Sequence, residues 1–190
     1  MAIIGLKYPV YGKFQEGEAP SWANGKVIGK AISSNITLDG TDANVLYAND
    51  AAAESDSAFQ GGNIELGVDD LEDKDYADLL GHKYTAATEN EPAVVVANSA
   101  DIAPYVGVGF YKTHVRNNVR TYQATVIHKV QFSEPSDAAN TRGERTEWQT
   151  PTITGAIMAD VNGDWKTQAT FTDEAAAKAW INTKLGVTEG

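Results

Sequence analysis

Apolar and polar residues alternate along much of this chain with a period of two, which places one kind of side chain on each face of a β-strand. The longest alternating run covers residues 120–132, and shorter runs cover residues 63–69 and 105–111. Weaker runs cover residues 7–14, 27–38, 93–97 and 149–159. One face of the longest run is predicted to hold Tyr122, Ala124, Val126, His128, Val130 and Phe132. The other face is polar except for Ile127. So many alternating segments predict a sheet-dominated fold.

Two segments have helical patterns instead. Residues 73–80 form a short predicted helix that Asp73 caps and Gly81 ends. A longer helix is predicted from Thr172, as its N-cap, to Gly186, with acidic side chains in the first turn where the helix dipole favours them. Its apolar stripe, which we expect to lie on the sheet, consists of Ala177, Trp180, Ile181 and Leu185.

Together these patterns predict a mainly β fold, a β-sandwich or half-closed barrel of antiparallel strands with one flanking α-helix. The pair Asn162-Gly163 lies between a run that ends at Met158 and a run that begins at Trp165. Both residues tolerate positive φ, so the pair predicts a tight hairpin turn. A chain of 190 residues has room for one domain with a hydrophobic core, and we expect a single domain over residues 1–190.

The charge of the chain argues against a protein that holds nucleic acid by electrostatic attraction. It carries 26 acidic and 15 basic side chains, a formal net charge of -11, and a surface of that sign repels phosphate backbones. There is no cysteine, which excludes thiol nucleophiles, thiolate metal sites and disulfides. The N-terminus lacks the pattern of a signal peptide, and no segment is apolar enough to span a membrane. We therefore expect a soluble protein made in a cytoplasm.

No motif for catalysis or metal binding is recognisable. The chain has no Gly-x-Ser-x-Gly elbow, and His128 lies on an apolar strand face, where a hydrogen-bonded core histidine is expected. The acidic segments 69–75 and 160–164 lack the spacing of a calcium-binding EF-hand loop. Gly107 and Gly109 lie inside a strand pattern and predict close approach of another backbone, not a nucleotide loop. The sequence predicts no enzyme activity, no cofactor and no metal.

Two long segments, residues 39–62 and 134–147, fit no regular element. Loops of this length usually carry function or become ordered on a partner. The few apolar side chains of the first segment, Leu46, Tyr47 and Phe59, are predicted contacts between subunits.

Several segments resemble, in their order, the major tail proteins of long-tailed, non-contractile phages and prophages of Gram-positive bacteria. The opening Ile-Gly-Leu-Lys-Tyr-Pro-Val-Tyr at residues 4–11 is similar to the start of these proteins, as is Leu-Tyr-Ala-Asn-Asp at residues 46–50. Gly-Asn-Ile-Glu-Leu-Gly-Val-Asp-Asp-Leu follows at 62–71 and Tyr-Val-Gly-Val-Gly-Phe at 105–110. Thr-Pro-Thr-Ile-Thr-Gly-Ala-Ile-Met at 150–158 resembles a late strand of the family. The resemblance is specific because the segments are collinear.

This resemblance implies a phage tail-tube fold: two packed antiparallel sheets, a flanking helix and an extended loop, here about residues 39–62, that reaches neighbouring subunits. It implies hexameric rings that stack into a hollow tube through which DNA passes without specific binding. The implied partners are copies of the chain, the tape measure protein and the tail terminator. The implied location is the virion tail, after assembly in the host cytoplasm. The immunoglobulin-like C-terminal domain of some relatives is not expected here.

An acidic lumen would keep DNA from adhering to such a tube. The candidates for lumen-facing acids are Glu65, Asp69, Asp70 and Glu72. Three other interpretations stay open on the sequence alone. A tail terminator or head–tail connector would form single rings, a β-sandwich carbohydrate-binding module would use exposed tryptophans, and an acid-pair hydrolase would use two carboxylates across a cleft.

Overall fold

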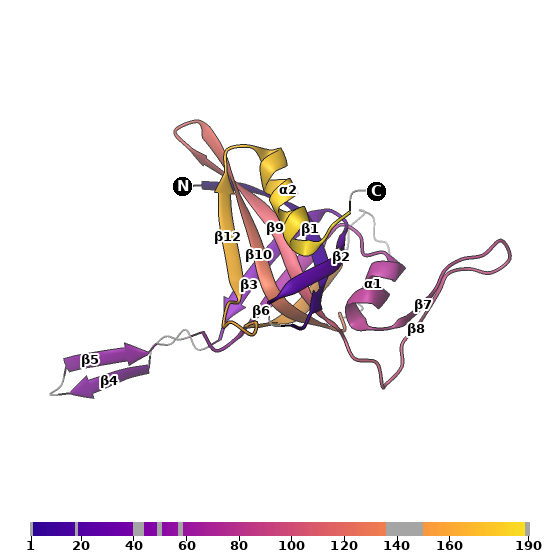
Figure 1. The fold of residues 1–190 in the computed structure, drawn as a ribbon, viewed down its shortest axis with the longest axis horizontal. Helices are drawn as coiled ribbons and strands as arrows, with labels where there is room; N and C mark the ends of the chain where they lie inside the picture. The colour runs from indigo at the N-terminus through magenta and orange to yellow at the C-terminus, as the bar shows by residue number, and fades with distance from the viewer. Residues whose placement is uncertain are drawn as a thin grey trace, which may run out of the picture.

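The fold is mainly β, as the alternating pattern predicts, in a computed structural model that describes residues 2–17, 19–39, 44–48, 51–56, 59–135 and 150–188 (Figure 1). The long central strands are β9 (Tyr105–Arg116) and β10 (Val119–Ser133). The other strands are β1 (Ala2–Gln15), β2 (Ser21–Val27), β3 (Ala31–Leu38), β4 (Asn44–Ala48), β5 (Ala51–Asp56), β6 (Gly62–Val68), β7 (Lys83–Thr85), β8 (Val94–Val96), β11 (Thr152–Met158) and β12 (Lys166–Phe171). The helices are α1 (Asp73–Leu80) and α2 (Glu174–Leu185), which confirm both predicted helices, although the fold class named only one flanking helix.

Strand β10 is the centre of one eight-stranded antiparallel sheet. The order is β2-β1-β9-β10-β11-β6-β3, and β12 also pairs with β10. One edge of β10 pairs with β9 along most of its length. The other edge pairs first with β12, along residues 122–127, and then with β11, along residues 129–133. The Asn162-Gly163 turn therefore does not join a hairpin, because β11 and β12 both pair with β10 and not with each other.

A bulge in β10 divides its apolar residues between two clusters. The register against β9 shifts between Ile127 and Val130. Before the shift, Ala124 and Val126 pack in the cluster under α2, and Ile127 points to the opposite face, into the main core. After the shift, Val130 and Phe132 also belong to the main core. The prediction of one continuous apolar face was wrong, because a bulge reverses the side on which later residues point.

The sheet curls around the main core, so that β3 comes close to β1 without pairing with it. The buried members of this core from the sheet include Tyr11, Ile64, Leu66, Val108, Phe110, Ile153 and Ile157. Helix α1 closes one side with Leu79 and Leu80. The second cluster lies on the opposite face of the sheet, where α2 covers Val10 and Tyr111.

Helix α2 packs on the sheet through Ala177, Ile181 and Leu185, which are fully buried. Its N-cap is Asp173, whose carboxylate accepts a hydrogen bond from the backbone N–H of Ala176 at 3.0 Å, and not the predicted Thr172. A carboxylate at this position also faces the positive end of the helix dipole, which favours Asp over Thr.

Polar side chains, some buried and some partly buried, attach α1 to β1 and β2. The hydroxyl of Tyr11 donates to Asp75 Oδ1 at 3.0 Å and lies 3.3 Å from Asp78 Oδ2. Lys13 and Lys26 both form ion pairs with Asp78. Burial raises the pKa of Asp75, whereas at Asp78 the same effect of burial is outweighed by the two lysines, which lower the pKa. The helix is thus oriented by charge as well as by its apolar residues.

Candidate functional site

Two hairpins lie outside the main sheet and project from opposite sides of the body (Figure 1). Strands β4 and β5 pair only with each other, and so do β7 and β8. The segment predicted to be an irregular loop over residues 39–62 therefore contains a hairpin. A two-stranded sheet is at best marginally stable in water unless something packs against it. These hairpins are the first candidates for contact with a partner.

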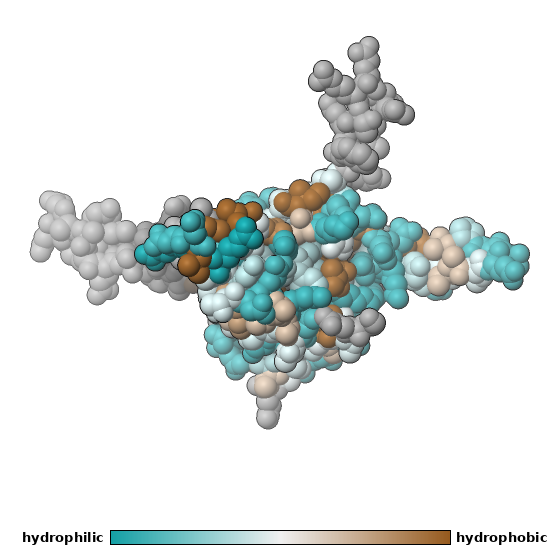
Figure 2. Space-filling view, turned by 90° about the horizontal axis from the view of Figure 1, so that it is seen from above, coloured by the Kyte–Doolittle hydropathy of each residue, from teal (hydrophilic) through white to brown (hydrophobic). Residues whose placement is uncertain are grey.

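The β7–β8 hairpin, residues 83–96, is called the arm below. One face of the arm carries Val94 and Val96, whose residues are 45% and 51% exposed. Its tip is acidic, because Glu89 and Glu91 are exposed there, and the backbone N–H of Glu91 donates to Thr88 Oγ1. In Figure 2 the arm extends to the right and ends in hydrophilic residues. The cross-strand neighbours Thr85 and Lys83 share the face of the two valines, so the arm combines a partly apolar face with a negatively charged tip.

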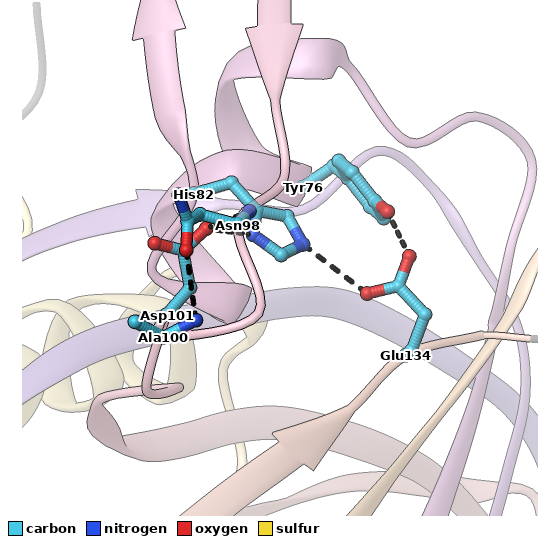
Figure 3. Close-up of polar contacts among 6 residues, drawn as sticks. All are labelled: Tyr76, His82, Asn98, Ala100, Asp101 and Glu134. Atoms are coloured by element: carbon cyan, nitrogen blue, oxygen red, sulfur yellow. Dashed lines mark hydrogen bonds and ion pairs between the residues drawn. The ribbon is translucent and has the colours of Figure 1, made fainter.

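A histidine cluster fixes the base of the arm (Figure 3). The ring Nδ1 of His82 lies 2.8 Å from Asp101 Oδ2, and Nε2 lies 3.1 Å from Glu134 Oε2. Asp101 Oδ2 also accepts from the backbone N–H of Asn98, and Tyr76 donates its hydroxyl proton to Glu134. The cluster joins α1, both ends of the arm and the end of β10.

The two carboxylates favour the charged form of this histidine. Only the imidazolium has protons on both nitrogens, so only that form donates to Asp101 and Glu134 together. The hydrogen bond with Asp101 is the main cause of the raised pKa of His82, and Glu134 adds to it. The pKa of Asp101 is lowered mainly by the backbone N–H of Asn98, and that of Glu134 mainly by Tyr76. The arm is therefore held by charge-assisted hydrogen bonds.

A shallow apolar groove lies between the start of β1 and β3, and it is called the edge groove below. The side chains that line it include Ile3, Ile4, Leu6, Ile32, Ser34 and Lys112. Ile3, Ile4 and Ile32 are 59%, 57% and 53% exposed. The first half of β1 pairs with β9 but not with β2, which begins its pairing at Val10. The groove is thus bordered by unpaired strand edges, which readily accept a strand from another chain.

A polar face covers strands β3, β6 and β11. Cross-strand neighbours point to the same side of a sheet, and Asn35, Glu65 and Thr154 are such neighbours. The residues of this face are Ser33, Asn35, Thr37, Asn63, Glu65, Thr152, Thr154 and Ala156. These three strands contain no lysine or arginine. The face therefore consists mainly of short, hydrophilic side chains, and Glu65 is its single charged residue.

The other three acidic candidates lie outside this face. Asp69 accepts from the backbone N–H of Lys30 at 2.5 Å, and this bond is the main cause of its lowered pKa. Its other oxygen lies 3.6 Å from Lys30 Nζ, so Asp69 fixes the turn between β2 and β3. Asp70 is exposed beside it, and Glu72, not the predicted Asp73, is the N-cap residue of α1. Of the four predicted lumen acids, Glu65 alone projects from the middle of a sheet face.

The three predicted subunit contacts differ in what the structure says of them. Leu46 and Tyr47 lie in β4 of the projecting hairpin, and their side chains are outside the described part of the molecule. Phe59 packs within its own chain, since its ring stacks on Trp165 with 4.8 Å between the ring centroids. The second predicted loop, residues 134–147, lies outside the described residues from residue 136 onwards.

His128 forms a second buried network, as the core interpretation predicts. Its Nδ1 lies 2.7 Å from Asp160 Oδ2, and its Nε2 lies 2.6 Å from Thr167 Oγ1. This order of hydroxyl, imidazole and carboxylate resembles a catalytic triad. However, the nearby backbone N–H groups of Asn162 and Asp164 both donate to Asp160, which leaves them unable to stabilise an oxyanion. The network ties β12 and the 160–164 turn to β10.

The described tryptophans contribute to packing within the chain. Trp22 donates its indole N–H to the carbonyl of His128 at 2.9 Å, and Trp165 stacks on Phe59. Trp180 lies against Phe171. None of the three forms an open sugar-stacking platform, and the fourth, Trp148, lies outside the described residues.

Within the described part of the chain, no cluster of three or more histidine and acidic side chains is arranged to hold a metal ion. Neither described helix is long and apolar enough to cross a membrane. A scan of known protein families finds none that matches the chain, and a search of curated proteins finds no significant match.

Sequence reasoning missed the partners of His82 and the arm that they hold. Asp101 and Glu134 are 19 and 52 positions away from His82, so no local motif joins them. The weak alternation over residues 93–97 signals β8, but it does not show that the strand leaves the main sheet. The edge groove depends on which strands lie side by side, and local periodicity does not predict strand order.

Proposed function

We propose that this chain is a structural subunit of a phage tail tube, with a tail-tube fold, that assembles into rings and stacks them into a hollow conduit for DNA. The ring is a homo-hexamer in this proposal, and the tape measure protein and tail terminator are further partners. The role is structural and not catalytic, in the virion tail after assembly in the host cytoplasm.

The observation that carries the proposal is the isolated β4–β5 hairpin. It lies far from the main sheet, on the side of the body opposite the arm (Figure 1). Two strands alone are marginal in water, and a neighbouring copy supplies the missing surface. The hairpin falls in the segment for which the sequence resemblance implies contact between subunits. We assign it to contacts between stacked rings.

The polar face of β3, β6 and β11 suits the lumen. DNA slides along a wall only if the wall offers no cations to its phosphates, because each neutralised phosphate adds affinity. The three strands have no basic residue, and Glu65 repels the backbone. Short hydroxyl and amide side chains leave such a wall smooth.

Assembly is tested by negative-stain microscopy and light scattering on the purified protein at rising concentration. Tubes of constant diameter, or rings with six times the chain mass, support the proposal. A monomer at every concentration overturns it. Single rings that never stack favour the terminator or connector alternative, and glycan binding by a stable monomer favours the carbohydrate-binding module.

A hairpin deletion separates ring formation from stacking. Replacing residues 43–57 by a short Gly-Ser linker removes β4 and β5 and leaves the main sheet intact. We expect a folded protein that forms rings but no tubes. Tubes of normal length from this variant would contradict the role assigned to the hairpin.

The lumen assignment is tested by DNA retention. Tubes of Glu65→Lys should retain short DNA duplexes at low salt and release them at high salt. Glu65→Gln is the matched control for loss of the carboxylate, and Thr170→Lys controls for an added cation on the exposed β12 position. Equal retention by the Glu65→Lys and Thr170→Lys tubes would place the face outside the lumen.

A further inference from the structure

We propose that the arm of one subunit inserts into the edge groove of the next subunit in the same ring. The inference rests on the proposed self-assembly and names the contact that closes the ring. The occupant of the groove is the β7–β8 hairpin of a second copy.

The apolar surfaces of the two elements match. The arm exposes Val94 and Val96 on one face, and the groove exposes Ile3, Ile4 and Ile32. Large apolar side chains that are half exposed on both surfaces gain by mutual burial. Because each surface is small, the pairing of a strand edge with a hairpin adds the directional hydrogen bonds that fix the register.

Charge and an unsatisfied hydroxyl point to the same occupant. The tip of the arm carries Glu89 and Glu91, whereas Lys112 lines the groove, so opposite charges meet. The buried Oγ of Ser34 also lines the groove and has no hydrogen-bond partner among the described residues. A backbone group of an inserted hairpin would supply that partner.

The placement of the two elements suits a ring. The start of β1 lies on the left of Figure 1 and the arm lies on the right. A contact between two different surfaces on opposite sides of a subunit is heterologous, and such contacts close into rings when the rotation between copies allows it. The His82 cluster holds the arm in a fixed direction, as that rotation requires.

Engineered disulfides test the contact cleanly because the chain has no cysteine. Val94→Cys and Ile32→Cys in one chain should give, after mild oxidation, a covalent ladder that ends at the mass of one ring. The two substitutions in separate chains, mixed, should give covalent dimers only. Val94→Cys with Asn162→Cys is the control, since Asn162 is exposed in the turn before the end of β12 that is aligned with Tyr11, not with the groove residues of β1. The same samples are imaged by negative stain.

Each outcome decides between the two proposals. A ladder in samples that contain rings or tubes supports the arm contact. Rings or tubes without cross-links overturn the contact and leave the tail-tube proposal standing. A ladder that continues beyond one ring overturns the assignment to a single ring, because the arm would then bridge stacked rings. Absence of both assemblies and cross-links overturns both proposals.

A charge exchange tests the same contact without cysteines. Glu89→Lys with Glu91→Lys should raise the concentration needed for half assembly by about tenfold, because like charges would face each other across the contact. Lys112→Glu alone should weaken assembly similarly, and the combined variant should recover most of the loss. Additive losses in the combined variant would contradict the contact.

Discussion

The ring of Phe59 lies parallel to the indole of Trp165, with 4.8 Å between the ring centroids and an interplanar angle of 1°. Phe59 stands where the chain returns from the β4–β5 hairpin to the main sheet, and Trp165 precedes β12. The stacked pair packs on the main core. An apolar residue that sequence reasoning assigned to a neighbouring subunit therefore anchors the base of the hairpin to its own chain.

Removing either ring should loosen this anchor. We expect Phe59→Ala and Trp165→Ala each to lower the free energy of unfolding by about 1–3 kcal/mol, because both rings are only partly buried. A double-mutant cycle measured by urea unfolding should show a coupling of about 1 kcal/mol between them. Fully additive losses would mean that the stacking itself contributes nothing.

Gly12→Ala should displace α2. A Cβ atom at this position would lie 2.5 Å from the carbonyl oxygen of Leu185, which is backbone and cannot rotate away. We expect a loss of about 1–3 kcal/mol in unfolding free energy, measured by urea titration. Gly5→Ala in the same strand is the matched control, since nothing lies within 4 Å of its Cβ position. Equal behaviour of the two variants would contradict the close packing of α2.

Asp160→Ala should be among the most destabilising single changes. The carboxylate accepts hydrogen bonds from His128, Asn162 and Asp164, so its loss leaves three donors without a partner. Burial alone would raise the pKa of Asp160, but these hydrogen bonds outweigh it and lower the pKa. We expect a loss of about 2–4 kcal/mol by thermal or urea unfolding. A smaller loss of unfolding free energy in Asp160→Asn would show that accepting hydrogen bonds matters more than the negative charge.

The His82 cluster should give the stability of the protein a pH window. The raised pKa of His82 means that its contribution is complete below about pH 6.5 and is lost as the pH rises through the folded-state pKa. Asp101 and Glu134 have lowered pKa values, so their contribution is present above about pH 4 and is lost as the pH falls through the folded-state values.

The stability difference between wild type and His82→Gln should therefore be largest between about pH 4.5 and 6.5 and decline on either side. Urea midpoints across pH 3–9 measure it. His114→Gln is the control for loss of a histidine as such. A constant difference over the whole range would mean that His82 acts through packing rather than through its charge.

Local periodicity was enough to predict the elements that make most of the fold. The run over residues 120–132 became β10. Of the predicted stripe on α2, Ala177, Ile181 and Leu185 are buried and Trp180 is partly buried, because each pattern reflects burial along one element. Gly107 and Gly109 do mark close packing, but the predicted neighbour was wrong, since side chains of Trp22 and α2 approach them and not another backbone.

Features that depend on strand order could not be predicted this way. The bulge between Ile127 and Val130 exists only relative to β9, and the pairing of both β11 and β12 with β10 requires contacts between distant segments. The same reason explains why the partners of His82 and the edge groove were missed. A residue pattern records which face is buried, but not which strand lies beside it.

The bulged strand β10 serves both apolar clusters at once. A slip of this strand by one position would move its side chains in each cluster to the opposite face of the sheet, so neither cluster can rearrange alone. The body should respond to mechanical load as one stiff block. If the proposed tube is built from such blocks, its bending should be taken up at the projecting hairpins between neighbouring subunits.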